Sequence, residues 1–274
     1  MKLSSLRGVS TQTEAYWEER GRVAASSELE AICYPSAPPL LNRYAAWSQR
    51  RTVGRLLRLV EPLDGKRVLD IGCGTGRWSR LVADRGGSVI GVDRSVSMVK
   101  EAKRRSPEIT FRRMDAVALL LPDDGFDLAI AVTVIQHLSY DEQVHALGEL
   151  ARVVRPGGHV LSVDRTGIDS DFSRSHGTFP RPRAEWVRLW RSVGAQPIRV
   201  YGQEFSYPLR LAAIGRFRSV VDGAGTDPTR RGGAGWRKAA LNVLVAASAF
   251  SELIVGGLAP AAPAEHVAVL YRLD

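Results

Sequence analysis

The stretch Val68-Leu-Asp-Ile-Gly-Cys-Gly-Thr-Gly76 decides the fold of this chain. Its first four residues are apolar apart from Asp70, which predicts a short buried strand, and glycines then alternate at positions 72, 74 and 76. A helical pattern follows over 77–84. A strand that passes through a glycine turn into a helix is typical of a ligand site at the carboxyl end of a parallel sheet. Glycine is needed where backbone approaches a ligand without a Cβ in the way.

The glycine spacing indicates which ligand fits. A dinucleotide fingerprint needs its third glycine at position 77, where this chain has Arg77, and the Gly-Lys-Ser/Thr ending of a phosphate loop is absent. The remaining pattern, D-x-G-x-G-x-G, places Asp70 before the first glycine. An acidic group there would repel a pyrophosphate, but it suits a ligand that carries an ammonium and a sulfonium.

This nonapeptide resembles the first motif of the class I methyltransferases that use S-adenosylmethionine, and the resemblance extends over residues 65–165. It implies transfer of a methyl group from S-adenosylmethionine to a small-molecule acceptor, at a hydroxyl, as in an O-methyltransferase of secondary metabolism or of a quinone-like ring. N- or C-methylation of a small molecule and a non-catalytic S-adenosylmethionine-binding protein stay open as alternatives. A dehydrogenase is a third class, which binding of S-adenosylhomocysteine rather than NAD would exclude.

Strand and helix patterns alternate along the chain, which predicts an α/β fold with a doubly wound sheet. We expect a Rossmann-like sheet of seven strands, mostly parallel with an antiparallel last strand, plus helical cap elements. The apolar run 126–134 is typical of a central strand buried on both faces. The strands are expected at 68–71, 88–93, 109–113, 126–134, 159–163, 197–201 and 266–271.

Two regions outside the motif are expected to be helical additions. Residues 1–60 are predicted to form an N-terminal helical cap before the methyltransferase domain of residues 61–274. Residues 204–264 are too long for a bare loop, so we expect a helical insertion that contributes to the acceptor pocket. Within the insertion, Glu252 and nearby prolines argue against a membrane span for the apolar stretch 239–257, which would instead form a buried helix, an apolar wall for the acceptor or a dimer surface.

The resemblance places the methionine end of the donor at Asp70 and Gly72, in the turn that Gly74 and Gly76 complete. Asp93 ends the second strand, where a carboxylate can accept hydrogen bonds from both hydroxyls of a ribose. This position also occurs in dinucleotide-binding folds, so the glycine spacing separates the two ligands. In the family the matching acid holds the adenosyl ribose, and we expect the same of Asp93.

Further donor contacts are expected after the second, third and fourth strands. Asp115 would accept a hydrogen bond from the adenine amino group, the backbone of Ala116 would face the ring, and Met98 would lie on its face. Arg94 stands where some members of the family carry a second polar or acidic residue, and we include it as a candidate donor contact. Thr133 follows the fourth strand, where donor and acceptor meet.

His137 is the first candidate for a general base, because histidine titrates near neutrality and the fourth strand would carry it toward the donor. His176, in the loop after the fifth strand, is the second candidate. Each has a purely structural alternative. Tyr16 is expected to close over the donor, on a helix that also carries Trp17 and Arg20.

Composition limits the partners. The chain has 274 residues and a formal net charge of +9, but its arginines are scattered without the interleaved aromatic residues of a nucleic-acid site. The first ten residues lack an apolar segment, so a secretory signal is not expected. Cys33 and Cys73 provide neither a disulfide framework nor metal-ligand spacing, which favours the cytoplasm and no metal site. We expect a partly apolar small-molecule acceptor, no nucleic acid and no membrane span; peripheral membrane contact and a homodimer stay open.

Overall fold

The computed structural model of the protein describes residues 14–33, 39–167, 177–203 and 266–274, which include one seven-stranded sheet. The strand order is β3-β2-β1-β4-β5-β7-β6. All neighbours pair in parallel except β7, which runs antiparallel to both β5 and β6. The predicted fold class is therefore confirmed. The strands are β1 (Arg67–Ile71), β2 (Ser88–Asp93), β3 (Thr110–Arg113), β4 (Phe126–Val132), β5 (Val154–Arg165), β6 (Ala195–Gln203) and β7 (His266–Leu273).

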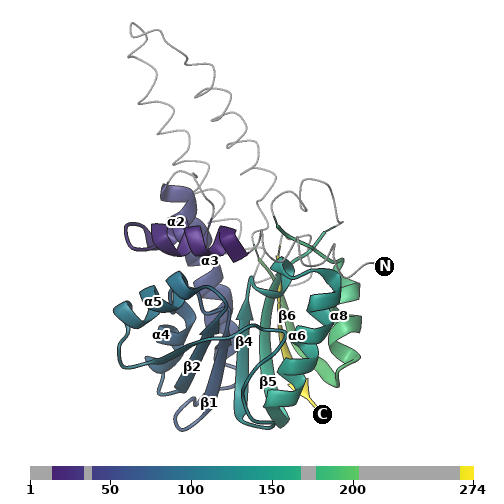
Figure 1. Cartoon of the computed structure of the whole chain (residues 1–274). Helices are drawn as coiled ribbons and strands as arrows, with labels where there is room; N and C mark the ends of the chain where they lie inside the picture. Colours follow the sequence, from purple (N-terminus) through teal and green to yellow (C-terminus); the bar gives the residue numbers. More distant parts are fainter. Residues whose placement is uncertain (1–13, 34–38, 168–176, 204–265) are drawn as a thin grey trace, which may run out of the picture.

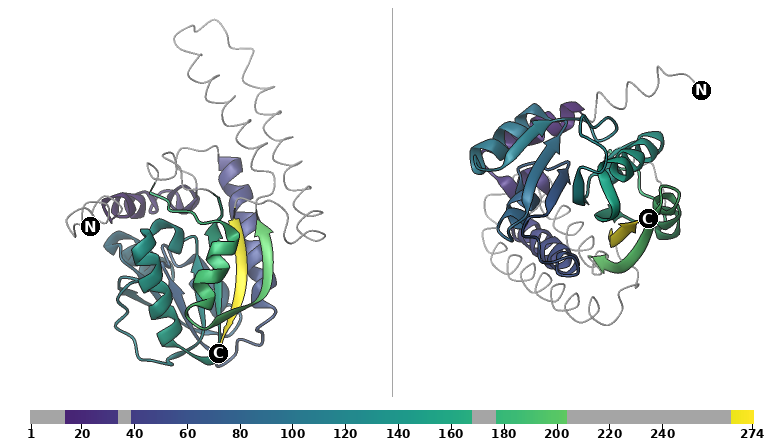
Figure 2. Two further views of the ribbon diagram at one scale, coloured as in Figure 1. Left: turned by 90° about the vertical axis from the view of Figure 1, so that its right-hand side faces the viewer. Right: turned by 90° about the horizontal axis from the view of Figure 1, so that it is seen from below.

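Helices cover both faces of the sheet (Figures 1 and 2). One face packs against α3, α4 and α5, and the other against α6 and α8, so that two separate apolar clusters form. Residues 14–23 are also helical and lie with α2 near the end of the sheet at which β1, β2 and β4 terminate (Figure 1). The remaining elements are α2 (Glu28–Ile32), α3 (Pro39–Leu57), α4 (Arg77–Ala83), α5 (Val96–Arg105), the 3₁₀ turn η1 (Ile135–His137), α6 (Tyr140–Val153) and α8 (Arg183–Arg191).

Local sequence explains where the helices begin. Ser95 caps α5, because its side chain accepts a hydrogen bond from the backbone of Met98 at 3.1 Å. Ser139 and Glu142 form a reciprocal capping box at the start of α6. No side chain caps α4, which starts directly after the left-handed Gly76, so its first backbone N–H groups remain available near the glycine turn.

Several strand boundaries differ from the prediction, most by one or two residues, and the differences at β5 and β4 have a clear structural cause. β5 begins at Val154 rather than at residue 159, because Phe126 pairs with Val154 and the next pair joins Leu128 to His159. Residues 155–158 therefore form an irregularity within the strand rather than a separate turn. β4 ends at Val132, since the next residue, Thr133, has a φ of 57° and leaves the extended conformation.

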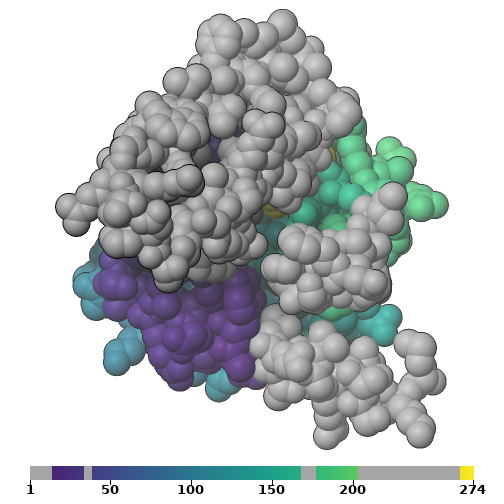
Figure 3. Space-filling model, turned by 90° about the horizontal axis from the view of Figure 1, so that it is seen from above, coloured from purple at the N-terminus to yellow at the C-terminus, as the bar shows by residue number. Residues whose placement is uncertain are grey.

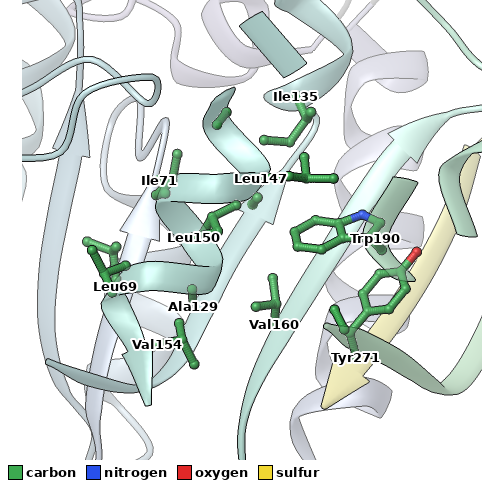
Figure 4. Close-up of a cluster of buried hydrophobic side chains, with 14 of the residues drawn as sticks. Leu69, Ile71, Ala129, Ile135, Leu147, Leu150, Val154, Val160, Trp190 and Tyr271 are labelled. Atoms are coloured by element: carbon green, nitrogen blue, oxygen red, sulfur yellow. The ribbon is translucent and has the colours of Figure 1, made fainter. Parts of the chain in front are cut away.

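The central strands are apolar throughout because both of their faces are buried. On β4, Ala129 and Ala131 join the cluster under α6 and α8, whereas Leu128 and Ile130 join the cluster under α3, α4 and α5. Figure 4 shows the first cluster, in which side chains from β1, β4, β5 and α6 interdigitate. Trp190 of α8 stacks on Tyr271 of β7 with ring centroids 4.8 Å apart, and this pair closes the core beside the edge strand β6.

The predicted N-terminal cap makes two different kinds of contact. Val53, Leu56 and Leu57 of α3 are fully buried in the same cluster as Val68 of β1, so α3 belongs to the core of the domain. Residues 14–23 and α2 lie instead over the end of the sheet (Figure 1). The division into residues 1–60 and 61–274 stays a prediction, and the expected insertion of residues 204–264 lies outside the described residues.

Replacing Leu147 with alanine should lower the free energy of unfolding by about 2–5 kcal/mol, because Leu147 is fully buried between α6 and the sheet. Urea denaturation measures the change. The matched control is Val144→Ala on the same helix, where the side chain is 47% exposed, and there the change should stay within about 1 kcal/mol. Equal losses in the two variants would contradict the assignment of this core.

Candidate donor-binding site

A cavity opens at the carboxyl ends of β1, β2 and β4. This is the edge where the strand order reverses between β1 and β4, which is the usual ligand position in an open α/β sheet. Most of the predicted site residues meet in its lining: Gly72, Gly74, Asp93, Arg94, Met98, Asp115, Ala116, Thr133 and His137. Asp70, Gly76 and Tyr16 are not part of the lining, and His176 lies outside the described residues.

The glycine turn presents bare backbone to the cavity. Gly72 and Gly74 have φ angles of 59° and 51°, in the left-handed region that favours glycine. A Cβ on Gly72 would lie 2.4 Å from the side chain of Val134. A Cβ on Gly74 would have no neighbour closer than 3.8 Å, and that neighbour, Ile32, itself lines the cavity. Gly74 therefore faces open space, as a ligand-contacting glycine should.

The third glycine of the motif has a different role. Gly76 has a φ of 79°, and a Cβ there would lie 2.7 Å from the ring of Phe111 on β3. Its small size thus lets α4 start close against the neighbouring strands. The structure assigns Gly76 to packing and backbone conformation, in place of the predicted donor contact.

Asp93 holds the glycine turn in place. Its Oδ2 accepts a hydrogen bond from the backbone N–H of Gly74 at 2.9 Å, and its Oδ1 accepts one from Ser95 at 2.9 Å. Burial raises the pKa of Asp93, although these two hydrogen bonds favour its charged form. One carboxylate therefore joins the ends of β1 and β2 and still faces the cavity.

Asp70 points away from the cavity. The side chain is 1% exposed and lies under the first turn of α4, where the hydroxyl of Ser79 donates to its Oδ2 at 2.5 Å. Its other oxygen, Oδ1, has no hydrogen-bond partner in the described part of the chain. Burial raises the pKa of Asp70 to about 7, although hydrogen bonds from Ser79 oppose the shift. The predicted direct contact to the donor is thus replaced by an acid that supports the turn from beneath.

The cavity wall beside the glycine turn contains the residues expected to contact adenine. Met98 is 1% exposed, and its neighbours in the lining are Met114, Asp115 and Ala116. The Oδ1 of Asp115 accepts a hydrogen bond from the backbone of Val117 at 3.3 Å, which keeps its loop turned toward the cavity. This wall combines sulfur and methyl groups with one carboxylate, a surface that suits a flat heterocycle with an exocyclic amine.

The N-terminal helix contributes Trp17 rather than Tyr16. Trp17 lines the cavity and packs edge-on against the ring of His137, with ring centroids 5.0 Å apart and planes at 81°. Tyr16 is 42% exposed and packs against Trp17 from outside. Adjacent residues on a helix differ in direction by about 100°, so only one of the two can face the cavity.

His137 is held as a neutral ring. Its Nδ1 lies 2.8 Å from the carbonyl oxygen of Gly177, which can only accept, so Nδ1 carries the proton. Its Nε2 lies 3.4 Å from the side-chain nitrogen of Gln136. Burial lowers the pKa of His137 to about 4, although the bond to Gly177 opposes this shift. The ring is therefore uncharged near neutral pH, and the lone pair on Nε2 accepts a long hydrogen bond from the amide of Gln136.

The backbone next to His137 is strained. Thr133 lines the cavity with a φ of 57°, which is rare for a β-branched residue. Its backbone N–H donates to the carbonyl of Val163 at 2.7 Å, so pairing with β5 maintains this conformation. Strain of this kind persists only where surrounding structure enforces it, and it is concentrated at functional sites.

Two further polar residues, Gln49 and Arg77, complete the lining. Gln49 of α3 is 8% exposed, and its amide makes no hydrogen bond within the described ranges. Arg77 donates to the carbonyl of Ala46, one turn before Gln49, at 3.0 Å. The amide of Gln49 is not among the fully buried unpartnered groups, so it is accessible from the cavity and can bind a ligand. Nothing in the helical pattern of α3 distinguished Gln49 from a surface residue.

Among the described residues, no group of three or more histidine, cysteine, aspartate or glutamate side chains is arranged to hold a metal ion. The helices in those same ranges are all too short or too polar to cross a membrane.

Comparison with known proteins agrees with this geometry. Residues 68–158 match a family model described as a methyltransferase domain. A demethylmenaquinone methyltransferase from Renibacterium salmoninarum is 43% identical over 122 residues, which cover 44% of this chain and 50% of that protein. A ubiquinone biosynthesis O-methyltransferase from Rhizobium rhizogenes is 36% identical over 119 residues, which cover 41% and 47% of the two chains. The chain thus spans about half the length of these curated relatives.

The fold comparison covers more of the molecule. A putative sarcosine dimethylglycine methyltransferase from Galdieria sulphuraria aligns with 86% of this chain and 90% of its own, at a TM-score of 0.59 and 15% identity. At that identity the likeness concerns the fold alone. The chain therefore contains a segment, residues 68–158, that matches a methyltransferase domain, within a fold that it shares with this structure.

The burial of Asp70 predicts a pH-dependent stability. Because its folded pKa of about 7 exceeds the ordinary 3.8, the folded state binds a proton that the unfolded state lacks between these values. Stability should therefore fall as pH rises from about 4 to 7, at roughly 1.4 kcal/mol per pKa unit at most.

Asp70→Asn should remove this contribution. Urea denaturation at pH 5 and pH 8 should show a smaller loss of stability in the variant than in the wild type. Asp141→Asn, at an exposed acid of α6, serves as the control and should leave the difference unchanged. The same pH dependence in Asp70→Asn and the wild type would contradict the assignment.

Proposed function

We propose that this protein binds S-adenosylmethionine in the cavity described above and transfers its methyl group to a small-molecule acceptor, at a hydroxyl oxygen. The observation that carries the proposal is the combination of an open, left-handed Gly74 with the carboxylate of Asp93, which holds the same turn. Bare backbone and a buried acid on adjacent strands suit a nucleoside that has no phosphate to satisfy.

The lining residues fit the parts of this donor. Each oxygen of Asp93 already accepts one backbone N–H, and each retains a second lone pair for a ribose hydroxyl. Met98, Asp115 and the backbone of Ala116 would hold the adenine ring. Arg94 also lines the cavity and forms an ion pair with Glu14 at 3.9 Å, so we assign it to the rim of the site.

The methionine end would lie between the glycine turn and α3. Gln49 offers an unpartnered amide, and Arg77 offers a cation beside it. A carboxylate in this position would satisfy both groups, since an amide N–H and a guanidinium each donate to carboxylate oxygens. The backbone carbonyl of Gly72, at the mouth of the turn, would accept from the ammonium.

Catalysis would depend mainly on alignment. When bound, S-adenosylmethionine supplies an electrophilic methyl group on a sulfonium. The sulfur departs as a neutral thioether, so the leaving group needs no protonation. The protein holds the reacting groups in line and excludes water, and such positioning can contribute roughly 7–11 kcal/mol. Trp17, Val134 and Leu138 give the remaining wall an apolar surface, which supports a partly apolar acceptor.

His137 supports the choice of a hydroxyl. An acceptor hydroxyl must lose its proton as the new bond forms, and the neutral ring of His137 lies in the cavity wall. Its Nε2 lone pair, now in a long contact with the amide of Gln136, would exchange that partner for the acceptor hydroxyl. Its lowered pKa makes it a weak base, so it would take the proton only as charge develops on the acceptor oxygen. Methylation at carbon or at an already neutral amine would make less use of this ring, and these alternatives stay open.

The relatives named above support a small, ring-containing acceptor, because one is named for demethylmenaquinone and the other for ubiquinone biosynthesis. Their names differ in the acceptor, and only the second name specifies oxygen as the methylated atom. A cytoplasmic location and a homodimer remain predictions.

Asp93→Asn should weaken binding of S-adenosylhomocysteine by about tenfold or more, because a charged acceptor for the ribose hydroxyls is lost. Isothermal titration calorimetry measures the affinity. Asp141→Asn again provides a control that should bind like the wild type. If Asp93→Asn binds S-adenosylhomocysteine normally while remaining folded, Asp93 does not hold the ribose. If the wild type prefers NAD to S-adenosylhomocysteine, the protein is not a methyltransferase.

His137→Ala should lower the rate of methyl transfer to hydroxyl acceptors by roughly a hundredfold, the ordinary size of a general-base contribution. Transfer from labelled donor to a panel of phenols, hydroquinones and amines can be followed by mass spectrometry. Affinity for S-adenosylhomocysteine should change little. His145→Ala, at an exposed histidine of α6, is the control. An unchanged rate in His137→Ala would leave this histidine a structural residue.

A further inference from the structure

Glu28, in the first turn of α2, makes a polar contact to the glycine turn from the N-terminal side. The hydroxyl of Thr75 donates to its Oε1 at 2.7 Å, although the two residues are 47 positions apart in sequence. Thr75 is fully buried and belongs to the lining of the donor cavity. The donor turn is thus bonded to a segment that lies outside the sheet.

The same carboxylate binds two arginines of the domain. Arg80 of α4 donates to Oε1 at 2.6 Å, and Arg105 of α5 donates to Oε2 at 3.3 Å. Arg80 also donates to the backbone carbonyl of Thr75 at 2.8 Å. Glu28, Thr75 and Arg80 therefore form a closed set of hydrogen bonds around the second half of the turn, and the Glu28 side chain is only 23% exposed.

Glu28 is itself placed by the helix of residues 14–23. Arg20 of this helix is 7% exposed and donates to the carbonyl of Ala31 at 2.9 Å, which holds the end of α2. Glu18 lies two residues before Arg20 on the same helix. It accepts a hydrogen bond from the backbone N–H of Ser97 at 3.1 Å and so docks the helix on the start of α5. Figure 3, which looks down on this end of the molecule, shows the purple residues seated against the blue domain.

The same N-terminal segment contributes two apolar residues to the cavity, Trp17 and Ile32. Residues 14–33 therefore cover the donor site with side chains on either side of Glu28 in sequence, while Glu28 bonds the turn that forms the floor. The turn has other supports: Gly74 is bonded to Asp93, and the backbone N–H of Cys73 donates to Val92 at 2.9 Å. Glu28 is thus not needed to build the turn, but it links the turn to its cover.

We propose that Glu28 is a positioning residue that couples the seating of residues 14–33 to the conformation of the donor turn. This inference rests on the proposed function, since it takes the cavity as the donor site. By thermodynamic linkage, a ligand that orders the turn stabilises the seated segment, and the seated segment raises the affinity for that ligand. Glu28 does not itself line the donor cavity and acts through Thr75, which does.

The test compares three full-length variants with S-adenosylhomocysteine as the probe. Glu28→Ala removes all three bonds, and Glu28→Gln keeps an acceptor for Thr75 but loses the charge that pairs with two arginines. Glu19→Ala is the matched control, because Glu19 lies on the same segment, is exposed and pairs with Arg22 at 2.7 Å. Calorimetry measures affinity, and hydrogen exchange measures protection of residues 14–33 with and without the probe.

In the wild type and in Glu19→Ala, the probe should slow amide exchange across residues 14–33. In Glu28→Ala this protection should largely disappear and affinity should fall by about tenfold or more, with Glu28→Gln between the two. A merely structural residue would lower the melting temperature without changing the probe-dependent part of the protection.

Thr75→Val keeps the arginine pairs and removes only the hydroxyl, so it tests the same link if Glu28→Ala fails to fold. It should reproduce the loss of protection. The inference is overturned if folded Glu28→Ala keeps wild-type affinity and wild-type protection. If only Thr75→Val folds, the same result in that variant overturns it. In either case the donor site itself would stand. If the wild type binds no S-adenosylhomocysteine, the proposed function fails, and this inference fails with it.

Discussion

The donor cavity depends on the carboxylate of Asp93, which accepts one backbone hydrogen bond from Gly74 and another from Ser95. β1 and β2 pair in parallel with Asp70 level with Gly91, so their carboxyl ends lie side by side. Asp93 can therefore reach across the strand end and stop the glycine turn from collapsing into the space that it borders. The same interaction orients the first residues of α5, and with them Met98, toward the cavity.

A second constraint is that the strand ends alone do not enclose the site. Trp17, Ile32 and Gln49 all precede β1 in sequence, yet they line the cavity. The segment that carries the first two is attached by carboxylates, Glu18 on the start of α5 and Glu28 on the turn. Partly exposed ionic contacts are individually weak, so such a cover can be attached and released at modest free-energy cost. This property suits a site that must admit a ligand and then exclude water.

The prediction from sequence was strongest where one local pattern determines the structure. The strand, the left-handed glycines and the acid at the end of β2 all have local signals, and the structure places them as expected. It was weaker where several roles share one residue type. Gly76 has the positive φ of its motif, but Phe111 occupies the space beside it, so the glycine serves packing. The side chain of Asp70 points to the opposite face of β1 from those of Leu69 and Ile71. It therefore contacts Ser79 of α4 instead of the cavity.

Residues far from the motif could not be found by pattern. The choice between Tyr16 and Trp17 depends on the rotation of one helix, and the roles of Glu28 and Gln49 depend on which elements meet at the strand ends. The sequence by itself determined the sheet, the turn and the position of the acid at the end of β2, because strand periodicity and glycine conformation are properties of neighbouring residues. Only the tertiary structure decided which side chains close the cavity, because those contacts join segments tens of residues apart and leave no trace in local spacing.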